Sequence, residues 1–103
     1  MTSLFEARER AYEAKWAHDE EMRFRVVARR NELVGRWAAV EMGLGPAESD
    51  RYVAAIIEMG MKSGDLGSLF RKIKSDLGPG HSDLTIRRKM DDFLKAASMD
   101  IGF

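Results

Sequence analysis

The stretch from Phe5 to Gly43 constrains the fold most, because it reads as one long helix whose two halves differ in character. At about 100° per residue, the apolar residues of its second half cover little more than half of a turn. These residues are Phe24, Val26, Val27, Leu33, Val34, Trp37, Ala38, Val40 and Met42. An apolar arc of this width predicts packing against two neighbouring helices.

The first half carries only a thin apolar line, formed by Phe5, Tyr12 and Trp16. Charged residues surround that line: Glu6, Arg8, Glu9, Arg10, Glu13, Lys15, Asp19, Glu20, Glu21 and Arg23. Three aromatic rings in so charged a segment can bury too little apolar area to hold that segment in place on the rest of the domain. Acid and base pairs four residues apart stabilise a helix by only about 0.3 kcal/mol each. We therefore expect partial helix or disorder before about residue 18 in the free protein.

Three shorter amphipathic helices should follow, separated by turns at 43–46, 60–64 and 78–80. Pro46 fits the first position of the second helix, Asp65 caps the third and Ser82 caps the fourth. Their apolar sides are, in chain order, Tyr52, Val53, Ile56, Ile57 and Met59; Leu66, Leu69, Phe70, Ile73 and Leu77; and Ile86, Met90, Phe93, Leu94, Ala97 and Ile101. No segment alternates with period two over the length of a strand. The sequence predicts an all-α, antiparallel four-helix bundle over residues 19–103, with an extended, partly disordered N-terminal segment over residues 1–18.

Gly35 is unusual because it lies inside the first helix, where glycine is about 1 kcal/mol less favourable than alanine. It predicts that another helix crosses closely at this point, near Trp37.

Composition excludes several functional classes. The 103 residues suit one domain without room for a deep catalytic cleft. Seventeen basic residues balance seventeen acidic ones, so a nucleic-acid partner is disfavoured. No cysteine is present, which removes disulfides and thiolate sites. The longest apolar run, Val53 to Ile57, is too short to cross a bilayer, so we expect a cytoplasmic protein that reaches a membrane only through a partner.

No catalytic or metal-binding motif is found. The stretch from Gly60 to Gly64 superficially resembles the end of a phosphate-binding loop, but Ala55 stands where that motif needs its first glycine, inside a predicted helix. His18 and His81 are far apart and lack metal-ligand spacing with acids. No nucleophile motif and no carboxylate pair in an apolar setting occur. We therefore expect a protein that is not an enzyme and that needs no metal or cofactor.

Two sets of side chains remain as candidates for binding. Arg25, Arg29 and Arg36 follow one outer strip of the first helix, which is either a solvated face or a site for an acidic partner or for phosphates. The Phe5, Tyr12 and Trp16 rings favour a partner, because aromatic residues and arginines dominate interface hot spots. The alternative is that this half folds back on the bundle.

The sequence resembles a known family along nearly its whole length. From Phe5 to Asp19, then at Phe24 and from Ala28 to Ala39, it is similar to the zeta-subunit inhibitors of F-type ATP synthase in alpha-proteobacteria. The similarity continues through Phe70-Arg71-Lys72 and from Thr85 to Met90.

This resemblance implies a non-catalytic subunit that inhibits ATP hydrolysis by the F1 sector. Its N-terminal segment would become helical as it inserts into a catalytic interface among the alpha, beta and gamma subunits and blocks rotation. Carried over by position, the contacts would be Phe5, Arg8, Glu9, Arg10, Tyr12, Lys15 and Trp16. The free protein would be a monomer, peripheral to the inner membrane through ATP synthase.

Two rival functions remain open beside inhibition. The family is associated with adenine-nucleotide binding to the bundle, so weak ADP or ATP binding is expected, although no motif locates the site. A nucleotide-sensing module is therefore one rival. A helical scaffold for another protein partner is the other.

Overall fold

The computed structural model describes the backbone of residues 4–63 and 65–102 and the side chains of residues 18–63 and 65–102. It contains helices α1 (Leu4–Glu41), α2 (Pro46–Ser63), α3 (Leu66–Leu77) and α4 (Asp83–Ile101), with a short 3₁₀ helix η1 (Gly78–Gly80) before α4. The described residues include no strand. The prediction of an all-α fold with four packed helices is confirmed.

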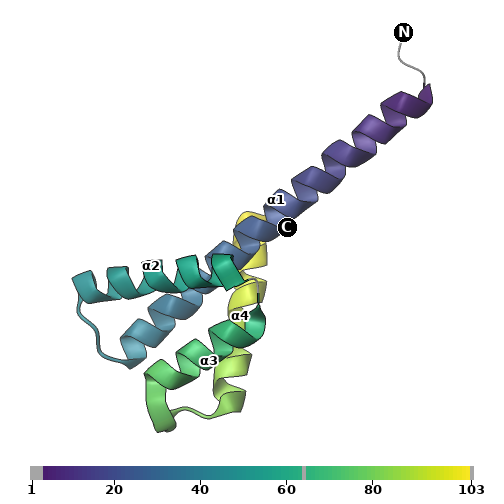
Figure 1. Ribbon diagram of the computed structural model, residues 1–103. Coiled ribbons are helices and arrows are strands. Elements are labelled where there is room, and N and C mark those ends of the chain that lie inside the picture. The colour runs from purple at the N-terminus through teal and green to yellow at the C-terminus, as the bar shows by residue number, and fades with distance from the viewer. Residues whose placement is uncertain (1–3, 64, 103) are drawn as a thin grey trace.

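Helix α1 organises the molecule, because every other α-helix packs against it (Figure 1). Its contacts with α2 and α4 are the most extensive, and α3 closes the gap between them. The N-terminal part of α1 continues in a straight line away from the other helices, which makes the molecule 63 Å long but only 29 × 23 Å across (Figure 1).

The core lies where the inner half of α1 meets the other three helices. Its central side chains are Val34, Ala38, Ile56, Leu69, Ile73, Ile86 and Met90. Trp37, Tyr52, Phe70 and Phe93 pack around this cluster with part of each ring exposed. The apolar arc of α1 therefore does contact more than one neighbour, as its width predicted.

The turn between α1 and α2 follows from glycine. Gly43 has a φ of +70°, and its N–H donates to the carbonyl of Val40 at 3.0 Å, while the Leu44 N–H donates to Ala39 at 3.0 Å. This pair of bonds satisfies carbonyl groups left free at the helix end. Pro46 then begins α2, as expected from its fixed φ.

Both predicted helix caps are confirmed. The Asp65 carboxylate accepts a hydrogen bond from the Gly67 N–H at 2.9 Å, and the Ser82 hydroxyl accepts one from the Thr85 N–H at 3.1 Å. The hydrogen bond from the Gly67 N–H, together with a second from the Ser68 hydroxyl, holds the pKa of Asp65 below its usual value.

The two glycines at the α1–α2 contact permit close packing. A Cβ on Gly35 would lie 3.3 Å from the Val53 Cα, which confirms that another helix crosses there. The prediction that Gly60 belongs to a helix-ending turn is wrong, because α2 continues to Ser63. Gly60 instead lies directly against the Asn31 side chain, which occupies the space that a Cβ would need.

Four residues predicted on apolar, packed faces are exposed. Phe24 is 60% exposed, Val40 is 74%, Leu66 is 55% and Leu94 is 36%. Val40 lies next to the C-terminal end of α1, whereas Phe24 and Leu66 line one groove near the opposite end of the bundle.

Candidate functional site

The seven predicted contact residues all belong to the outer part of α1. They are Phe5, Arg8, Glu9, Arg10, Tyr12, Lys15 and Trp16. The backbone of this part is helical from Leu4 (Figure 1). Their side chains lie outside the described residues, so their contact with a partner stays a prediction, as does the order of residues 1–18 in the free protein.

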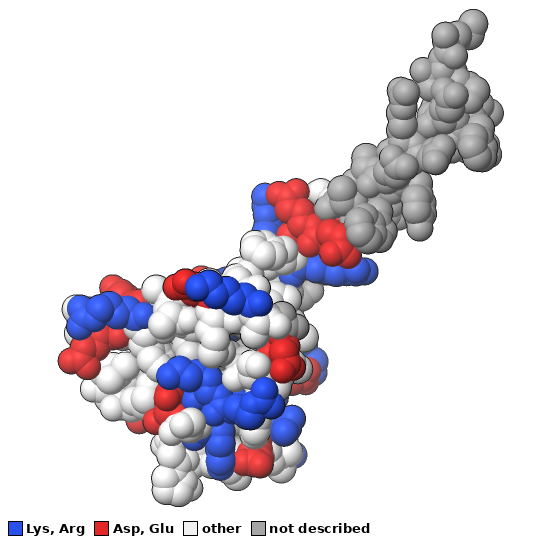
Figure 2. All heavy atoms as spheres, in the orientation of Figure 1, with Lys and Arg blue, Asp and Glu red and all other residues white. Residues whose placement is uncertain are grey.

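Ion pairs cover α1 where it leaves the bundle. Arg23 pairs with Glu20 at 3.4 Å and Arg25 pairs with Glu21 at 2.9 Å. Acidic and basic atoms accordingly lie next to each other on this part of the helix (Figure 2). Exposed pairs of this kind add only about 0.3–0.5 kcal/mol each. Their main effect is to leave this surface without net charge.

The arginine strip on the outside of α1 is also paired within the protein. Arg29 contacts Glu32 and Asp100 of α4, each at 3.2 Å, and these contacts raise its pKa. Arg36 contacts Glu32 and Asp50 of α2, each at 3.6 Å. These arginines tie α1 to its neighbours, which favours the solvated-face interpretation over a phosphate site.

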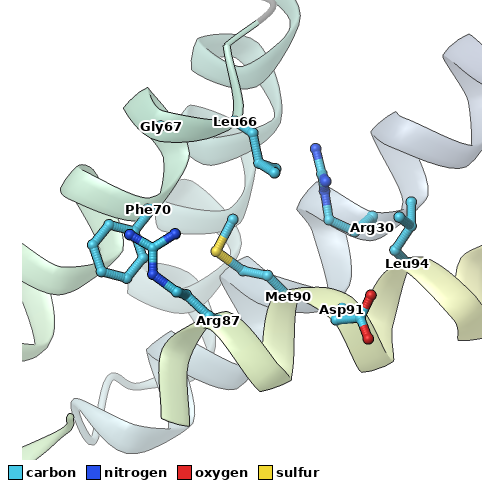
Figure 3. A pocket seen from close by; sticks show the side chains of 8 residues that line it. All are labelled: Arg30, Leu66, Gly67, Phe70, Arg87, Met90, Asp91 and Leu94. Atoms are coloured by element: carbon cyan, nitrogen blue, oxygen red, sulfur yellow. The ribbon is translucent and has the colours of Figure 1, made fainter. Parts of the chain in front are cut away.

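Two other arginines, Arg30 and Arg87, line a pocket between α1, α3 and α4. The pocket encloses about 210 Å³ and is mostly apolar. In Figure 3, Arg30 points between Leu66 and Leu94, and Arg87 lies against the Phe70 ring. The Arg87 guanidinium carbon is 4.1 Å from the ring centroid, which is the geometry of a cation–π contact.

Arg30 is the least expected member of this pocket. It is only 8% exposed, and its Nε donates to the Asn31 Oδ1 at 2.9 Å. Burial lowers the pKa of its guanidinium, but arginine is so strongly basic that the group stays charged near neutral pH. No carboxylate among the described residues lies within ion-pair distance of it. A buried cation without a counter-ion is unfavourable, so this end of the pocket attracts anions.

Sequence reasoning missed Arg30, although a signal was present. At about 100° per residue, Arg30 and Asn31 fall inside the apolar arc of α1. Arg30 lies between the directions of the buried Val26 and Val34, and Asn31 lies just beyond Val34. Two polar residues inside an apolar arc indicate either a buried hydrogen bond or a binding site. The structure shows both side chains buried.

The histidines do not form a site together. His18 is exposed on α1. His81 lies in the turn before α4, where its Nε2 is 3.1 Å from a Glu41 carboxylate oxygen and its ring meets the Trp37 ring edge-on at 5.7 Å. This contact fastens the turn to the end of α1.

The described residues contain neither a metal-binding cluster nor a membrane-spanning helix. Within 18–63 and 65–102, no three potential metal-ligand side chains converge. None of the helices in the described part of the chain combines the length and apolar character that crossing a bilayer requires.

Comparison with known proteins gives one family. The family model described as ATPase inhibitor subunit zeta matches residues 1–100. No curated protein and no solved structure matches the chain significantly.

Proposed function

The chain belongs to the ATPase inhibitor subunit zeta family, a family of non-catalytic regulators that bind the F1 sector and inhibit ATP hydrolysis by ATP synthase, and we propose that residues 1–18 perform the inhibition. This segment enters a catalytic interface of F1, contacts the alpha, beta and gamma subunits and blocks rotation. The bundle stays outside as a monomeric body, on the cytoplasmic side of the inner membrane.

The observation that carries this proposal is the division of α1 into two parts. Its inner part is fixed, because Val34 and Ala38 are fully buried in the core. Its outer part extends beyond the other three helices (Figure 1). A helix held at one end and projecting at the other suits insertion into a cleft. Its aromatic residues and arginines are of the kind that dominate interface affinity.

Ordering of the segment on binding suits a regulator. If residues 1–18 order fully only inside F1, the lost conformational entropy subtracts from the affinity. Inhibition then stays reversible while the contact surface remains large.

Deletion of Met1 to Asp19 tests the proposal. We expect the truncated protein to lose inhibition of F1 ATP hydrolysis, while its circular dichroism and thermal unfolding still report a folded bundle. Every buried core side chain that the structure describes comes after Asp19 in the sequence, which justifies that expectation. A truncated protein that inhibits as well as the full chain would contradict the proposal.

A substitution pair refines the test. The double substitution Tyr12→Ala, Trp16→Ala should weaken inhibition at least tenfold, because these rings are the predicted anchors. The matched control Val40→Ala changes an exposed residue on the same helix but outside residues 1–18, and it should inhibit normally.

The pocket with Arg30 and Arg87 supports a second function, weak binding of ADP or ATP. Its apolar wall suits an adenine ring, and its two guanidinium groups suit phosphates. ADP or ATP titrated into the protein should shift the amide signals of Phe70 and Arg87 saturably.

Neighbouring arginines provide the control for this second function. Arg87→Gln should weaken nucleotide binding about tenfold, since a hydrogen bond to a charged group contributes about 1.5–3 kcal/mol. Arg88→Gln changes an exposed arginine outside the pocket and should not. Equal affinity in both variants would remove the pocket as the site.

A further inference from the structure

An apolar surface surrounds α1 where it leaves the bundle. Phe24 of α1 and Leu66 of α3 are more than half exposed, and Leu94 of α4 is 36% exposed. Val27 and Met61 lie beside them with part of each side chain exposed. We call these five residues the collar.

Two hollows make the collar one continuous surface. A groove of about 660 Å³ runs between α1, the end of α2 and the start of α3, with Phe24 and Leu66 on its walls. A second hollow of about 360 Å³ lies between α1 and α4 and includes Leu94. Both include Val27 and Arg23, so the two hollows meet at α1.

The collar differs from the other exposed apolar side chains. A single exposed apolar residue is normal on a protein surface. Val40 and Met99 are of that kind, because neither lines a hollow described here. In the collar, five apolar side chains from all four helices gather around two recesses, which is the form of a protein-binding surface.

The charges around the collar select a protein over a membrane or nucleic acid. Glu20 and Glu21 neutralise Arg23 and Arg25 on the helix itself. Asp65 pairs with Arg71 at 3.6 Å on the opposite wall. Arg30 at the bottom of the groove keeps its charge, but it is only 8% exposed. Along the rim of the collar, the described residues form no unbalanced basic stripe, so this rim fits an apolar patch on a folded partner.

The position of the collar identifies the partner. A helix rises about 1.5 Å per residue, so Phe24 lies about 12 Å along α1 from Trp16. We infer that the collar docks on the outer surface of F1, beside the opening into which the N-terminal segment inserts. This inference rests on the proposed function. A second copy of the chain is the competing occupant, and it would give crosslinks between two copies of this chain in place of crosslinks to F1.

Docking through the collar would supply affinity that the segment alone lacks. The collar is already folded, so it loses little conformational entropy on binding. Once it is bound, insertion of the segment becomes intramolecular, with a high effective concentration.

Photocrosslinking of the full chain to purified F1 tests the inference directly. The photoreactive residue p-benzoylphenylalanine is placed at position 24 or, as control, at position 40. Both positions are exposed on α1, but only the first lies in the collar. We expect crosslinks to an F1 subunit from position 24 alone. Crosslinks from neither position, or equally from both, would overturn the inference. So would crosslinks from position 24 only to a second copy of the chain.

Affinity measurements separate this inference from the proposed function. Phe24→Asp should weaken F1 binding about tenfold, whereas Val40→Asp should leave it unchanged. If Phe24→Asp binds normally while Tyr12→Ala, Trp16→Ala loses inhibition, the collar inference fails and segment insertion stands. If Phe24→Asp weakens binding while the Tyr12 and Trp16 variant still inhibits, the insertion mechanism fails and collar docking stands.

Discussion

Asn31 and Gly60 show how a single contact fixes the α1–α2 packing. Asn31 is fully buried, and its Oδ1 accepts the hydrogen bond from Arg30. The space beside it exists only because residue 60 has no side chain. A Cβ at that position would lie 2.0 Å from the Asn31 Nδ2 and 2.9 Å from its Cγ. The polar pair in the core and the helical glycine are therefore parts of one arrangement.

Gly60→Ala should therefore destabilise the protein, even though alanine favours helix by about 1 kcal/mol. Asn31 must move, and overpacking of a core usually raises the free energy of the folded state by about 1–3 kcal/mol. The difference between these two effects is a net loss of up to about 2 kcal/mol, measured by urea unfolding. In a protein that already carries Asn31→Ala, adding Gly60→Ala should lower the free energy of unfolding by less than it does in the wild type, because the Asn31 amide no longer occupies the space of the new methyl group. Gly45→Ala is the control, because nothing lies within 4 Å of its added Cβ. A stabilising Gly60→Ala would show that Asn31 relocates freely.

At the residue scale, local chemistry was predictable from the sequence and exposure was not. The caps Asp65 and Ser82 follow from residue type and spacing, and the glycine at position 35 inside a helix predicts the close crossing of a second helix. The exposure of Phe24 depends on how far α2, α3 and α4 reach along α1, which no local pattern encodes. The Arg30 pocket depends on three helices meeting, so its residues are scattered in the sequence.

Among the elements, α2 and α3 are joined by a polar contact at the edge of the core. The Tyr52 hydroxyl of α2 donates to a carboxylate oxygen of Asp76 in α3 at 2.7 Å. Burial, then the bond to Asp76, raises the pKa of Tyr52 well above its usual value. Lys72 also contacts Asp76, at 3.0 Å, but from a more exposed position. The tyrosine, rather than the lysine, should carry most of the stability in this contact.

Tyr52→Phe should lower the free energy of unfolding at pH 7 by about 1–2 kcal/mol, since a hydrogen bond to a carboxylate is lost. Lys72→Met should change it by less than about 0.5 kcal/mol, as an exposed ion pair contributes little. Chemical unfolding of the two variants checks this. Equal losses would mean that the ion pair, and not the hydroxyl, joins the two helices.

The same tyrosine predicts a dependence of stability on pH. Because its pKa is raised on folding, its contribution is complete below the unfolded value of about 10. It is lost as pH rises from there toward the folded pKa. The wild type should therefore lose more stability between pH 9 and about pH 11 than Tyr52→Phe does. Tyr12 is present in both proteins, so the difference reports Tyr52 alone. Parallel curves would contradict the expectation.

The whole molecule is long because its central helix is longer than the domain it stabilises. The radius of gyration is 17.7 Å, against about 13 Å for a compact chain of this size. This difference distinguishes a projecting N-terminal segment from one folded back on the bundle. The sequence left both open, because three aromatic rings at helical spacing serve either arrangement.

Small-angle X-ray scattering of the free monomer tests whether the N-terminal segment projects from the bundle or lies on it. We expect a radius of gyration near 18 Å for the full chain and about 12 Å for the 84 residues that remain after deletion of Met1 to Asp19. A full-length value near 13 Å would mean that the N-terminal half lies on the bundle, which would remove the free segment that insertion requires.

The unbroken backbone of α1 through the core also has a mechanical consequence. A force applied by the F1 rotor to the N-terminal end of α1 would be transmitted along the helix to its crossing with α2 at Gly35 and Val53. The torque would then load side-chain packing instead of a hinge, because α1 continues as helix from its tip to Glu41. Under the proposed mechanism, resistance to rotation would therefore depend on the rigidity of the protein's own core as much as on its contacts with F1.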